Sequence, residues 1–439
     1  MGFKDLFKKK KKNKVCVIGL DGVPYSLLQN LAQQGVMPYT AELLDSGYLH
    51  KMKASLPEIS AVSWTNFMTG SNPGTHGIFG FTDFKKGSYD LRFPNFLDLQ
   101  KETFWDTLGK QKKKSIIINQ PSTYPARKLN GTLISGFVAI DLAKAVFPYP
   151  LKDSLQKINY QIDIDTFKSR EDHEFLWKDL EKTLQGREKA FQSLWKEDWD
   201  YFEIVVTGTD RLMHFLWNAY EDSQHFYHQN FLDYFRKVDN LMYKVGSSFK
   251  KLNGNREGLY ILSDHGFTGI KQEVFLNAWL EKENYLQFNT SSPQNLSQLS
   301  PKSQAFALDP NRIYVHLKNK FPQGCVDESE KEELKREITD KLNRLEYQGE
   351  KVVRRVFDSN EIYKGPFLSH GPDLLVLSHY GFDMKGSVKK KEVFGRSHLQ
   401  GMHTWDDAFF WSATEKAQDL TISHLSSIIL NHFQKSHDS

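Results

Sequence analysis

Short runs of mostly apolar residues recur along the chain and predict buried β-strands. The clearest occupies residues 15–20 and stops at Asp21-Gly22. Similar runs lie at residues 115–118, 202–206, 259–262 and 374–377. Strands that are buried on both faces have this pattern, whereas half-exposed strands alternate between apolar and polar positions.

Helical patterns lie between several of these runs. In residues 171–197 the apolar positions recur at helical spacing among charged residues, residues 218–250 repeat the pattern, and residues 327–345 form a third charged amphipathic segment. Strands that alternate with helices predict an α/β fold, with a mostly parallel central sheet and helices on both of its faces.

The chain also predicts a division into parts. Residues 289–303 turn to Asn, Ser, Gln and Pro, which is typical of a loop or linker. We therefore expect one catalytic domain over residues 14–436, with a subdomain or lid inserted at about residues 268–370.

Composition narrows the class of protein. Hydrophobic residues make up 39% of the 439 residues and charged residues 26%, which excludes a disordered, collagen-like or membrane-spanning class. The two cysteines, Cys16 and Cys325, form neither a disulfide framework nor a zinc ribbon. A reducing, cytoplasmic setting is therefore expected, and any metal must be held by histidines and carboxylates.

The positive charge is concentrated at the N-terminus. Residues 1–14 have a net charge of +6, whereas the whole chain has a net charge of +4, so the rest of the chain has a net charge near −2. Because the body of the protein is not basic, no nucleic-acid partner is expected. One interpretation of residues 1–13 is a disordered leader. The other is a peripheral contact with the anionic inner face of a membrane, because Phe3, Leu6 and Phe7 have i, i+3, i+4 spacing before the lysine run.

Four segments place a carboxylate or an imidazole beyond a strand or near one. Asp21 follows the first run, Asp264 and His265 follow the run at 259–262, and His403 lies between two apolar stretches. Asp210 and His214 have the i, i+4 spacing that places two side chains on one face of a helix. Each alone is typical of a helix cap or a structural histidine, but the set together suits two zinc ions in one cleft.

Ser60 stands at the start of a predicted helix over about residues 60–70. A helix N-terminus favours an anion, which can be a phosphate group or the serine alkoxide. A serine hydroxyl is a weak nucleophile unless a base or a metal removes its proton, and no histidine base is near it in sequence. The alternative is that Ser60 only caps its helix.

Six short motifs occur in an order that resembles the alkaline phosphatase superfamily. More narrowly, the chain is similar to the type I phosphodiesterase/nucleotide pyrophosphatase group and its bacterial phosphohydrolase or phosphomutase relatives. The motifs are Val17-Ile18-Gly19-Leu20-Asp21-Gly22, Ser60 nine residues before Thr69-Gly70, Asn72-Pro73-Gly74-Thr75-His76-Gly77-Ile78, Gly208-Thr209-Asp210 with His214, Ser263-Asp264-His265-Gly266, and Gly401-Met402-His403.

The resemblance implies a role for each of these residues. One divalent metal would be held by Asp210, His214 and His403, and the other by Asp21, Asp264 and His265, with Ser60 bridging toward it. Zinc suits this ligand set best, and manganese would also accept it. Ser60 would be the nucleophile that forms a phosphoserine intermediate. Where the phosphodiesterases have a threonine nucleophile and an asparagine three residues on, this chain has Ser60 and Ser63, so Ser63 becomes a candidate substrate-binding residue.

The expected function is metal-dependent hydrolysis of a phosphodiester or phosphomonoester. A phosphotransferase or phosphomutase of the same superfamily is an alternative, and a catalytically silent protein that binds a phosphorylated ligand is another. The expected substrate is a small phosphorylated molecule: a nucleotide, a lipid head group or a sugar phosphate. Phe81, Phe84, Tyr124 and Phe137 are available as pocket walls.

Overall fold

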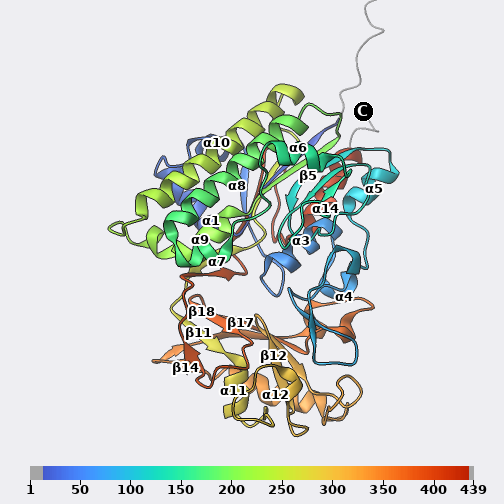
Figure 1. Cartoon of the computed structure of the whole chain (residues 1–439), viewed down its shortest axis with the longest axis vertical. Helices are drawn as coiled ribbons and strands as arrows, with labels where there is room; N and C mark the ends of the chain where they lie inside the picture. The colour runs from blue at the N-terminus through green and yellow to red at the C-terminus, as the bar shows by residue number, and fades with distance from the viewer. Residues whose placement is uncertain (1–12, 435–439) are drawn as a thin grey trace, which may run out of the picture.

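The computed structural model describes residues 13–434, and its largest element is an eight-stranded sheet (Figure 1). Five neighbouring strands, β9 to β6 in the sheet order, run parallel, while β21 and β7 pair antiparallel with the strands beside them. In sheet order the strands are β2 (Tyr48–Met52), β21 (Ala408–Ser412), β9 (Leu259–Leu262), β1 (Val15–Leu20), β8 (Tyr201–Val206), β5 (Ser115–Gln120), β6 (Gly131–Ser135) and β7 (Val146–Phe147).

Helices cover both faces of this sheet, which confirms the predicted α/β fold with a mostly parallel sheet. Successive residues of a strand point to opposite faces, and in β1 both sets are apolar and buried. One face is covered by α1 (Tyr25–Gln33), α2 (Pro38–Ser46), α8 (His173–Leu194), α9 (Gly208–Glu221) and α10 (His228–Asn253). The other is covered by α3 (Ser60–Thr69), α5 (Phe104–Lys110) and α14 (His424–Gln434).

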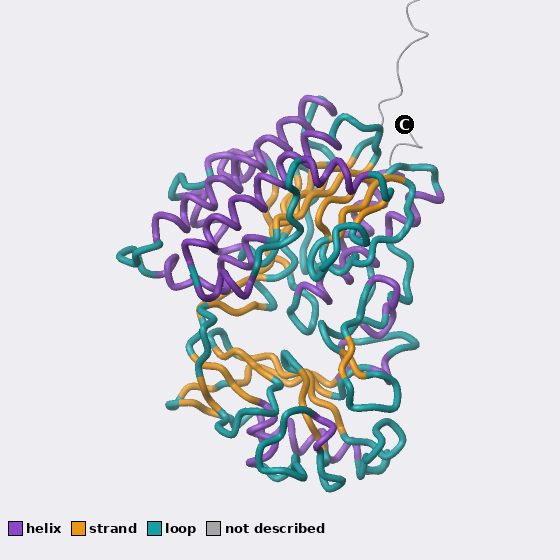
Figure 2. Tube along the Cα trace, viewed as in Figure 1, coloured by secondary structure: helices purple, strands orange, loops and turns teal. Residues whose placement is uncertain are grey.

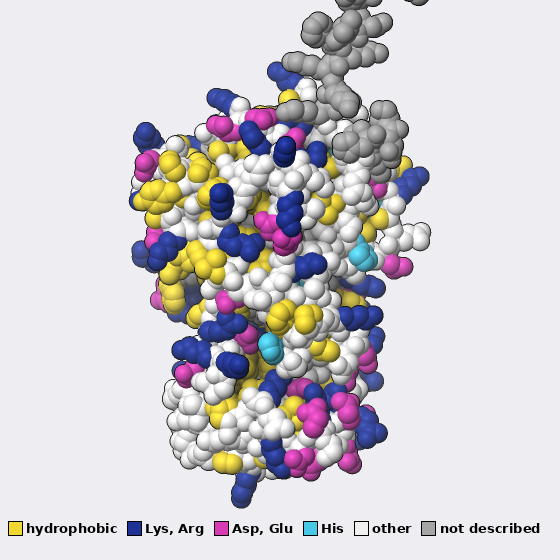
Figure 3. All heavy atoms as spheres, turned by 90° about the vertical axis from the view of Figure 1, so that its right-hand side faces the viewer, with side chains coloured by type: hydrophobic (Ala, Val, Ile, Leu, Met, Phe, Trp, Pro, Cys, Tyr) yellow, Lys and Arg dark blue, Asp and Glu magenta, His cyan; other side chains and the backbone are white. Residues whose placement is uncertain are grey.

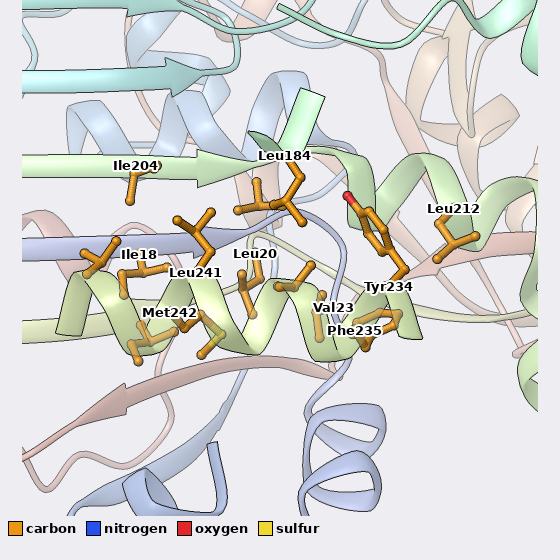
Figure 4. Close-up of a cluster of buried hydrophobic side chains, with 14 of the residues drawn as sticks. Ile18, Leu20, Val23, Leu184, Ile204, Leu212, Tyr234, Phe235, Leu241 and Met242 are labelled. Atoms are coloured by element: carbon orange, nitrogen blue, oxygen red, sulfur yellow. The ribbon is translucent and has the colours of Figure 1, made fainter. Parts of the chain in front are cut away.

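Figure 4 shows how the first face is packed. Leu241 and Met242 of α10 lie against Ile18 and Leu20 of β1, and Ile204 of β8 belongs to the same cluster. Every one of these side chains is at most 2% exposed. The apolar run at residues 15–20 is therefore explained by burial against helices on both sides.

A second group of strands and helices lies below the main sheet in Figures 1 and 2. We call this region, residues 270–400, the second lobe. Its apolar core includes residues from Val274 to Val393. The lobe contains α11 (Leu276–Lys282), α12 (Lys331–Leu342), the antiparallel sheet β12 (Ala305–Leu308)–β13 (Arg312–Val315)–β17 (Leu374–Ser378)–β16 (Val353–Asp358), and the sheet β18 (Phe382–Lys385)–β11 (Gln272–Phe275)–β19 (Phe394–Gly395).

The apolar run at residues 374–377 differs from the other four runs because it does not join the main sheet. It forms β17, an inner strand of the second lobe's four-stranded sheet. Leu374 and Val376 belong to the main core of the lobe, while Leu375 and Leu377 pack in a separate cluster with Phe357. Burial on both faces gave this strand the pattern of a parallel core strand.

The described helices match the three predicted segments closely but not at their ends. The segment 171–197 is α8, the segment 327–345 contains α12, and the segment 218–250 is divided between two helices. The chain leaves helical geometry at Asp222 and re-enters it at His228. The shorter elements are α4 (Pro73–His76), α6 (Leu151–Lys157), α7 (Thr166–Glu171), α13 (Ser359–Ile362), β3 (Asp83–Phe84), β4 (Leu91–Arg92), β10 (Gly266–Gly269), β14 (Glu346–Tyr347), β15 (Glu350–Lys351) and β20 (Gly401–Thr404).

The expected N-terminal tail falls almost entirely on residues 1–12, which lie outside the described residues. None of the described helices has the length and apolar character needed to cross a membrane. On the face in Figure 3, lysine and arginine side chains are spread over the whole height of the molecule with acidic side chains between them.

Candidate active site and metal centre

Three neighbouring strands of the main sheet end at the same edge, and each is followed by an acidic side chain. β9, β1 and β8 are adjacent and parallel, with Leu262 paired to Gly19 and Leu20 paired to Val206. Asp21 directly follows β1, Asp264 follows β9, and Asp210 lies in the first turn of α9 just after β8. The topology therefore gathers carboxylates that are far apart in the sequence.

The histidines come from the same region and from the short strand pair β10–β20. In this pair Phe267 is opposite His403, which brings residue 403 beside His265 at the entry to β10. The rings of His265 and His403 are stacked with centroids 3.7 Å apart. His214 lies one helical turn after Asp210 on α9, and its Nε2 is 3.4 Å from Asp210 Oδ1.

Ser60 lies among these side chains. It is the first residue of α3, and its Oγ is 3.2 Å from Asp21 Oδ1 and 3.1 Å from His265 Nε2. The residue in the N-cap position is Ile59, and the helix has no side-chain cap. The alternative that Ser60 only caps its helix is therefore wrong, because its hydroxyl faces the Asp/His cluster.

The structure thus brings together all six predicted ligand side chains and Ser60. His403 Nε2 is 2.9 Å from His214 Nε2 and 3.1 Å from Asp210 Oδ1. Ligand atoms within 4.8 Å of one another form two groups, Asp21–Asp264–His265 and Asp210–His265–His403. The first group is one of the two ligand sets implied by the resemblance. In the second group His265 appears with Asp210 and His403, and His214 adjoins it.

The three imidazoles are all oriented in the same way. Each has its Nδ1 within hydrogen-bond distance of a backbone carbonyl oxygen: 2.9 Å from Gly401 for His214, 2.8 Å from Glu58 for His403, and 3.0 Å from Gly266 for His265. A carbonyl only accepts, so each Nδ1 carries a proton and each Nε2 faces the cluster. Metal-binding histidines are commonly fixed in this manner.

Burial keeps two of these imidazoles neutral. It lowers the pKa of His214 to about 4 and lowers the pKa of His265 well below its usual range. Burial also lowers the pKa of His403, but the hydrogen bond and charge of Asp210 outweigh it and raise the pKa overall. Neutral imidazole is the form that binds a metal.

The three carboxyl groups of the cluster lie close together, and there is too little positive charge beside them to balance all three. Burial raises the pKa of Asp21 well above its usual range, and the charges of Asp264 and Asp210 raise it further. Burial likewise raises the pKa of Asp264 to about 7. The pKa of Asp210 is lowered because His214, His403 and Arg211 together outweigh its burial. Arg211 is itself paired with Asp163 at 2.7 Å.

Two features of the cluster fit divalent cations. Asp264 Oδ2 is buried and has no hydrogen-bond partner among residues 13–434, and His265 Nε2 lies 3.4 Å from it. The Nε2 atoms of His214 and His403 are 2.9 Å apart and both face the cluster. A cation would satisfy the Asp264 oxygen, and carboxylate oxygens and neutral imidazoles of this kind suit zinc or manganese.

Two glycines of the first motif, and Trp64, which has no signal of its own in the sequence, support the cluster. Trp64 Nε1 donates to Asp21 Oδ2 at 3.1 Å from one turn beyond Ser60. Gly19 makes room for it, since a Cβ there would lie 2.6 Å from the Trp64 ring. Gly22, at φ +72°, turns the chain after Asp21 and its N–H donates to Asp264 Oδ1 at 3.0 Å.

Ser63 is fully buried, and its hydroxyl is engaged within the protein. Its Oγ lies 2.7 Å from Ser55 Oγ and accepts from the Ser55 N–H at 3.2 Å. A role for Ser63 in substrate binding stays a prediction. Among the four aromatic residues expected in pocket walls, Phe81 and Tyr124 line a cavity. Phe84 instead packs edge-on against Phe306 in the core of the second lobe.

A cavity of about 90 Å³ opens onto His214 and His403, and the second lobe forms its far wall. The lobe contributes Lys385, whose Nζ is 2.6 Å from Asp383 Oδ2. Burial lowers the pKa of Lys385, but the charge of Asp383 outweighs it and raises the pKa overall. A cavity of about 730 Å³ shares Ile59 and Lys385 with the smaller one.

Comparison with known proteins identifies the family and the fold of the chain. The profile of the type I phosphodiesterase / nucleotide pyrophosphatase family matches residues 15–406. No curated protein matches the chain significantly.

Solved structures share the fold at low sequence identity. Phosphonoacetate hydrolase from Sinorhizobium meliloti, in complex with phosphonoacetate, is 12% identical, with a TM-score of 0.65 over 97% of this chain and 96% of that chain. The alkaline phosphatase PafA is also 12% identical, with a TM-score of 0.58 over 97% and 96%. Murine ectonucleotide pyrophosphatase / phosphodiesterase 5, inactive and in complex with AMP, is 11% identical, with a TM-score of 0.56 over 96% and 95%.

Proposed function

The chain belongs to the type I phosphodiesterase / nucleotide pyrophosphatase family of the alkaline phosphatase superfamily, and we propose that it hydrolyses a phosphoester through the hydroxyl of Ser60. Hydrolysis of phosphoester bonds is the chemistry of this family. The position of Ser60 Oγ, within 3.2 Å of both Asp21 and His265 in a buried Asp/His cluster, carries the proposal.

Two divalent cations would be held by the six ligand side chains. Asp21, Asp264 and His265 form one set, and the other set consists of Asp210, His214 and His403. When bound, such a pair of ions activates the attacking oxygen and stabilises the charge on both the attacking and the leaving oxygen.

The residues of the chain supply the positioning. α3 presents Ser60 at its N-terminal end, where the helix dipole favours the negative charge that develops on the attacking oxygen and the phosphate. Three backbone carbonyls hold the imidazoles with Nε2 toward the cluster. Lys385 lines the same cavity as His403 and has the charge to pair with a phosphate oxygen.

The proposed reaction consists of two successive displacements at phosphorus. Ser60 Oγ forms a bond to phosphorus as the bond to the leaving oxygen breaks, and the serine proton leaves with the alcohol. Water then attacks the phosphoserine, its oxygen stays on phosphorus, and one of its protons restores the Ser60 hydroxyl.

Loss of the Ser60 hydroxyl tests the proposal directly. Ser60→Ala is expected to lower kcat for a p-nitrophenyl phosphomonoester or phosphodiester by on the order of 10³-fold or more, because the nucleophile is gone. Ser71→Ala is the matched control, since Ser71 Oγ donates to Thr69 Oγ1 beyond the far end of α3. Metal analysis of the purified protein and recovery of activity with zinc or manganese after chelation identify the ions. Turnover by Ser60→Ala equal to that of the parent protein would contradict the proposal.

A further inference from the structure

A separate cavity of about 430 Å³ begins one residue after Ser60. Its α3 wall consists of Ala61, Thr65 and Met68, which have the i, i+4, i+7 spacing of one helix face. The helix that presents the nucleophile therefore also forms the wall of this cavity. We call it the α3 cavity.

The rest of the α3 cavity is almost entirely apolar. The other walls come from residues 78–81, 93–99, 122–124 and 138–140, and none of the lining side chains is charged. The hydroxyls of Thr65 and Ser122 both donate to the Ala61 carbonyl, at 2.6 and 3.2 Å, and Asn95 Oδ1 accepts from the Leu97 N–H. Few polar groups are left for a ligand, so the cavity suits an apolar group and offers little to a charged one.

Several large apolar side chains at the cavity wall are exposed to solvent. Phe93 is 73% exposed, Val138 is 59% exposed and Ile140 is 88% exposed, and all three line the α3 cavity. Scattered single exposures are ordinary, but three around one cavity mark a place where a ligand covers apolar surface.

The α3 cavity also adjoins the reaction site. Phe81 lines both this cavity and the 730 Å³ cavity, which in turn shares Ile59 and Lys385 with the cavity over His403. Ile59 and Ala61 flank Ser60 in the chain. A substrate whose phosphorus lies at Ser60 can therefore extend an apolar group along α3.

We propose that the substrate is an amphiphilic phosphoester whose alkyl or acyl chain occupies the α3 cavity. This inference rests on the proposed function and names its substrate class. A volume of about 430 Å³ lies within the range of small-molecule sites. A nucleobase is disfavoured because its ring edge needs hydrogen-bond partners, and most of the polar side chains of this cavity are engaged within the protein.

A chain-length series tests the proposal on the metal-loaded protein. For methyl, butyl and octyl p-nitrophenyl phosphates, kcat/KM is expected to rise with each added methylene, by at most about four-fold per methylene, because apolar surface is buried. The variant Phe93→Ser/Ile140→Ser changes exposed side chains and is expected to flatten this series while turnover of the methyl ester persists. Phe226→Ser is the matched control, since Phe226 is 82% exposed and lies outside the cavity.

A binding measurement separates this inference from the proposed function. In calorimetric titrations, Ser60→Ala is expected to bind octyl phosphate at least ten-fold more tightly than methyl phosphate. When Phe93→Ser and Ile140→Ser are added to Ser60→Ala, this preference is expected to be lost. Equal turnover and equal binding of short and long chains would overturn the inference and leave the hydrolase proposal intact. Faster turnover of thymidine p-nitrophenyl phosphate than of octyl p-nitrophenyl phosphate would also overturn the inference. Absence of turnover for every ester, with the binding preference retained, would overturn the proposed function alone.

Discussion

Glu203 is a carboxyl group inside the apolar interior of the main sheet. It lies in the middle of β8, fully buried, on the face that also presents Tyr201 and Val205. Its Oε2 accepts from the Tyr201 hydroxyl at 2.6 Å, while Oε1 has no hydrogen-bond partner in the part of the chain that the structure describes. Burial raises the pKa of Glu203 to about 8, although the tyrosine hydrogen bond opposes the shift.

This carboxyl group is expected to make stability depend on pH. Between the ordinary pKa of 4.5 and the folded value of about 8, the folded protein holds a proton that the unfolded chain has lost. The free energy of unfolding therefore falls as pH rises through this window, by at most about 1.4 kcal/mol per pH unit. Glu203→Gln, which cannot ionise, is expected to remove this slope and to be the more stable protein at pH 9 by a few kcal/mol.

Urea unfolding from pH 5 to pH 9 measures this difference. Glu257→Gln is the control, because Glu257 is exposed in the loop before β9. Parallel stability curves for Glu203→Gln and the parent protein would contradict the assignment of the slope to Glu203.

At the residue scale, the Asp and His positions of the cluster were predictable because each has a local signal, such as a strand end or an i, i+4 pair. Trp64 and Lys385 lack such a signal. Trp64 reaches Asp21 only because Gly19 lets its ring lie against β1, and Lys385 reaches the cavity only because the second lobe faces the sheet edge. Contacts of this kind depend on packing between distant segments, which residue types alone do not reveal.

At the element scale, α2 depends on a side chain from another helix. Its N-cap position is Met37, which has no side chain able to cap. Asp239 of α10 takes that place: Oδ2 accepts from the Tyr39 N–H at 2.8 Å, and Oδ1 accepts from the Thr40 N–H at 2.9 Å and from the Thr40 hydroxyl at 2.6 Å. One buried carboxylate therefore both caps α2 and joins it to α10.

Asp239→Ala is expected to lower the free energy of unfolding by about 2–3 kcal/mol. The lost cap accounts for about 1–2 kcal/mol, and the buried donors left without an acceptor add to it. Asp239→Asn retains only one oxygen and should fall between the parent and the alanine variant. Urea unfolding measures the effect, with Asp233→Ala on the exposed side of α10 as the control. An effect of Asp239→Ala no larger than that of the control would show that α2 does not depend on this cap.

Among the strands, those with a long apolar run and a clear stop were the ones predictable from the sequence. The runs that became β1, β5, β8 and β9 combine apolar composition with a clear stop, and each pairs with at least one similar parallel strand. The four-residue strands β12 and β13 and the edge strand β2 escaped prediction, because their stability comes from partners that the local pattern does not name. The break between α9 and α10 was missed for a related reason: only Asp222 and the residues after it mark the turn.

At the scale of the whole molecule, the ligand cluster links segments from Asp21 to His403. These segments follow three strands of the main sheet or lie on β20, and the unfolded chain would hold their side chains far apart. The order of the motifs could be predicted from the sequence, but the way in which the second lobe closes over the cluster could not. That closure rests on β10, β20 and the two larger sheets of the lobe, which none of the apolar runs indicated as a unit.

Because the ligands converge only in the folded protein, metal binding is expected to stabilise the whole fold. A ligand that binds only the folded state adds about 2.7 kcal/mol at a concentration 100 times its Kd. The Tm of the chelator-treated protein should therefore rise steadily as zinc or manganese is restored. His214→Ala should weaken this rise because it removes a metal ligand, whose Nε2 lies 2.9 Å from His403 Nε2. His370→Ala, at an exposed site in the second lobe, should keep the rise unchanged. A Tm independent of metal concentration would show that the cluster does not bind these ions, whatever the activity of the protein.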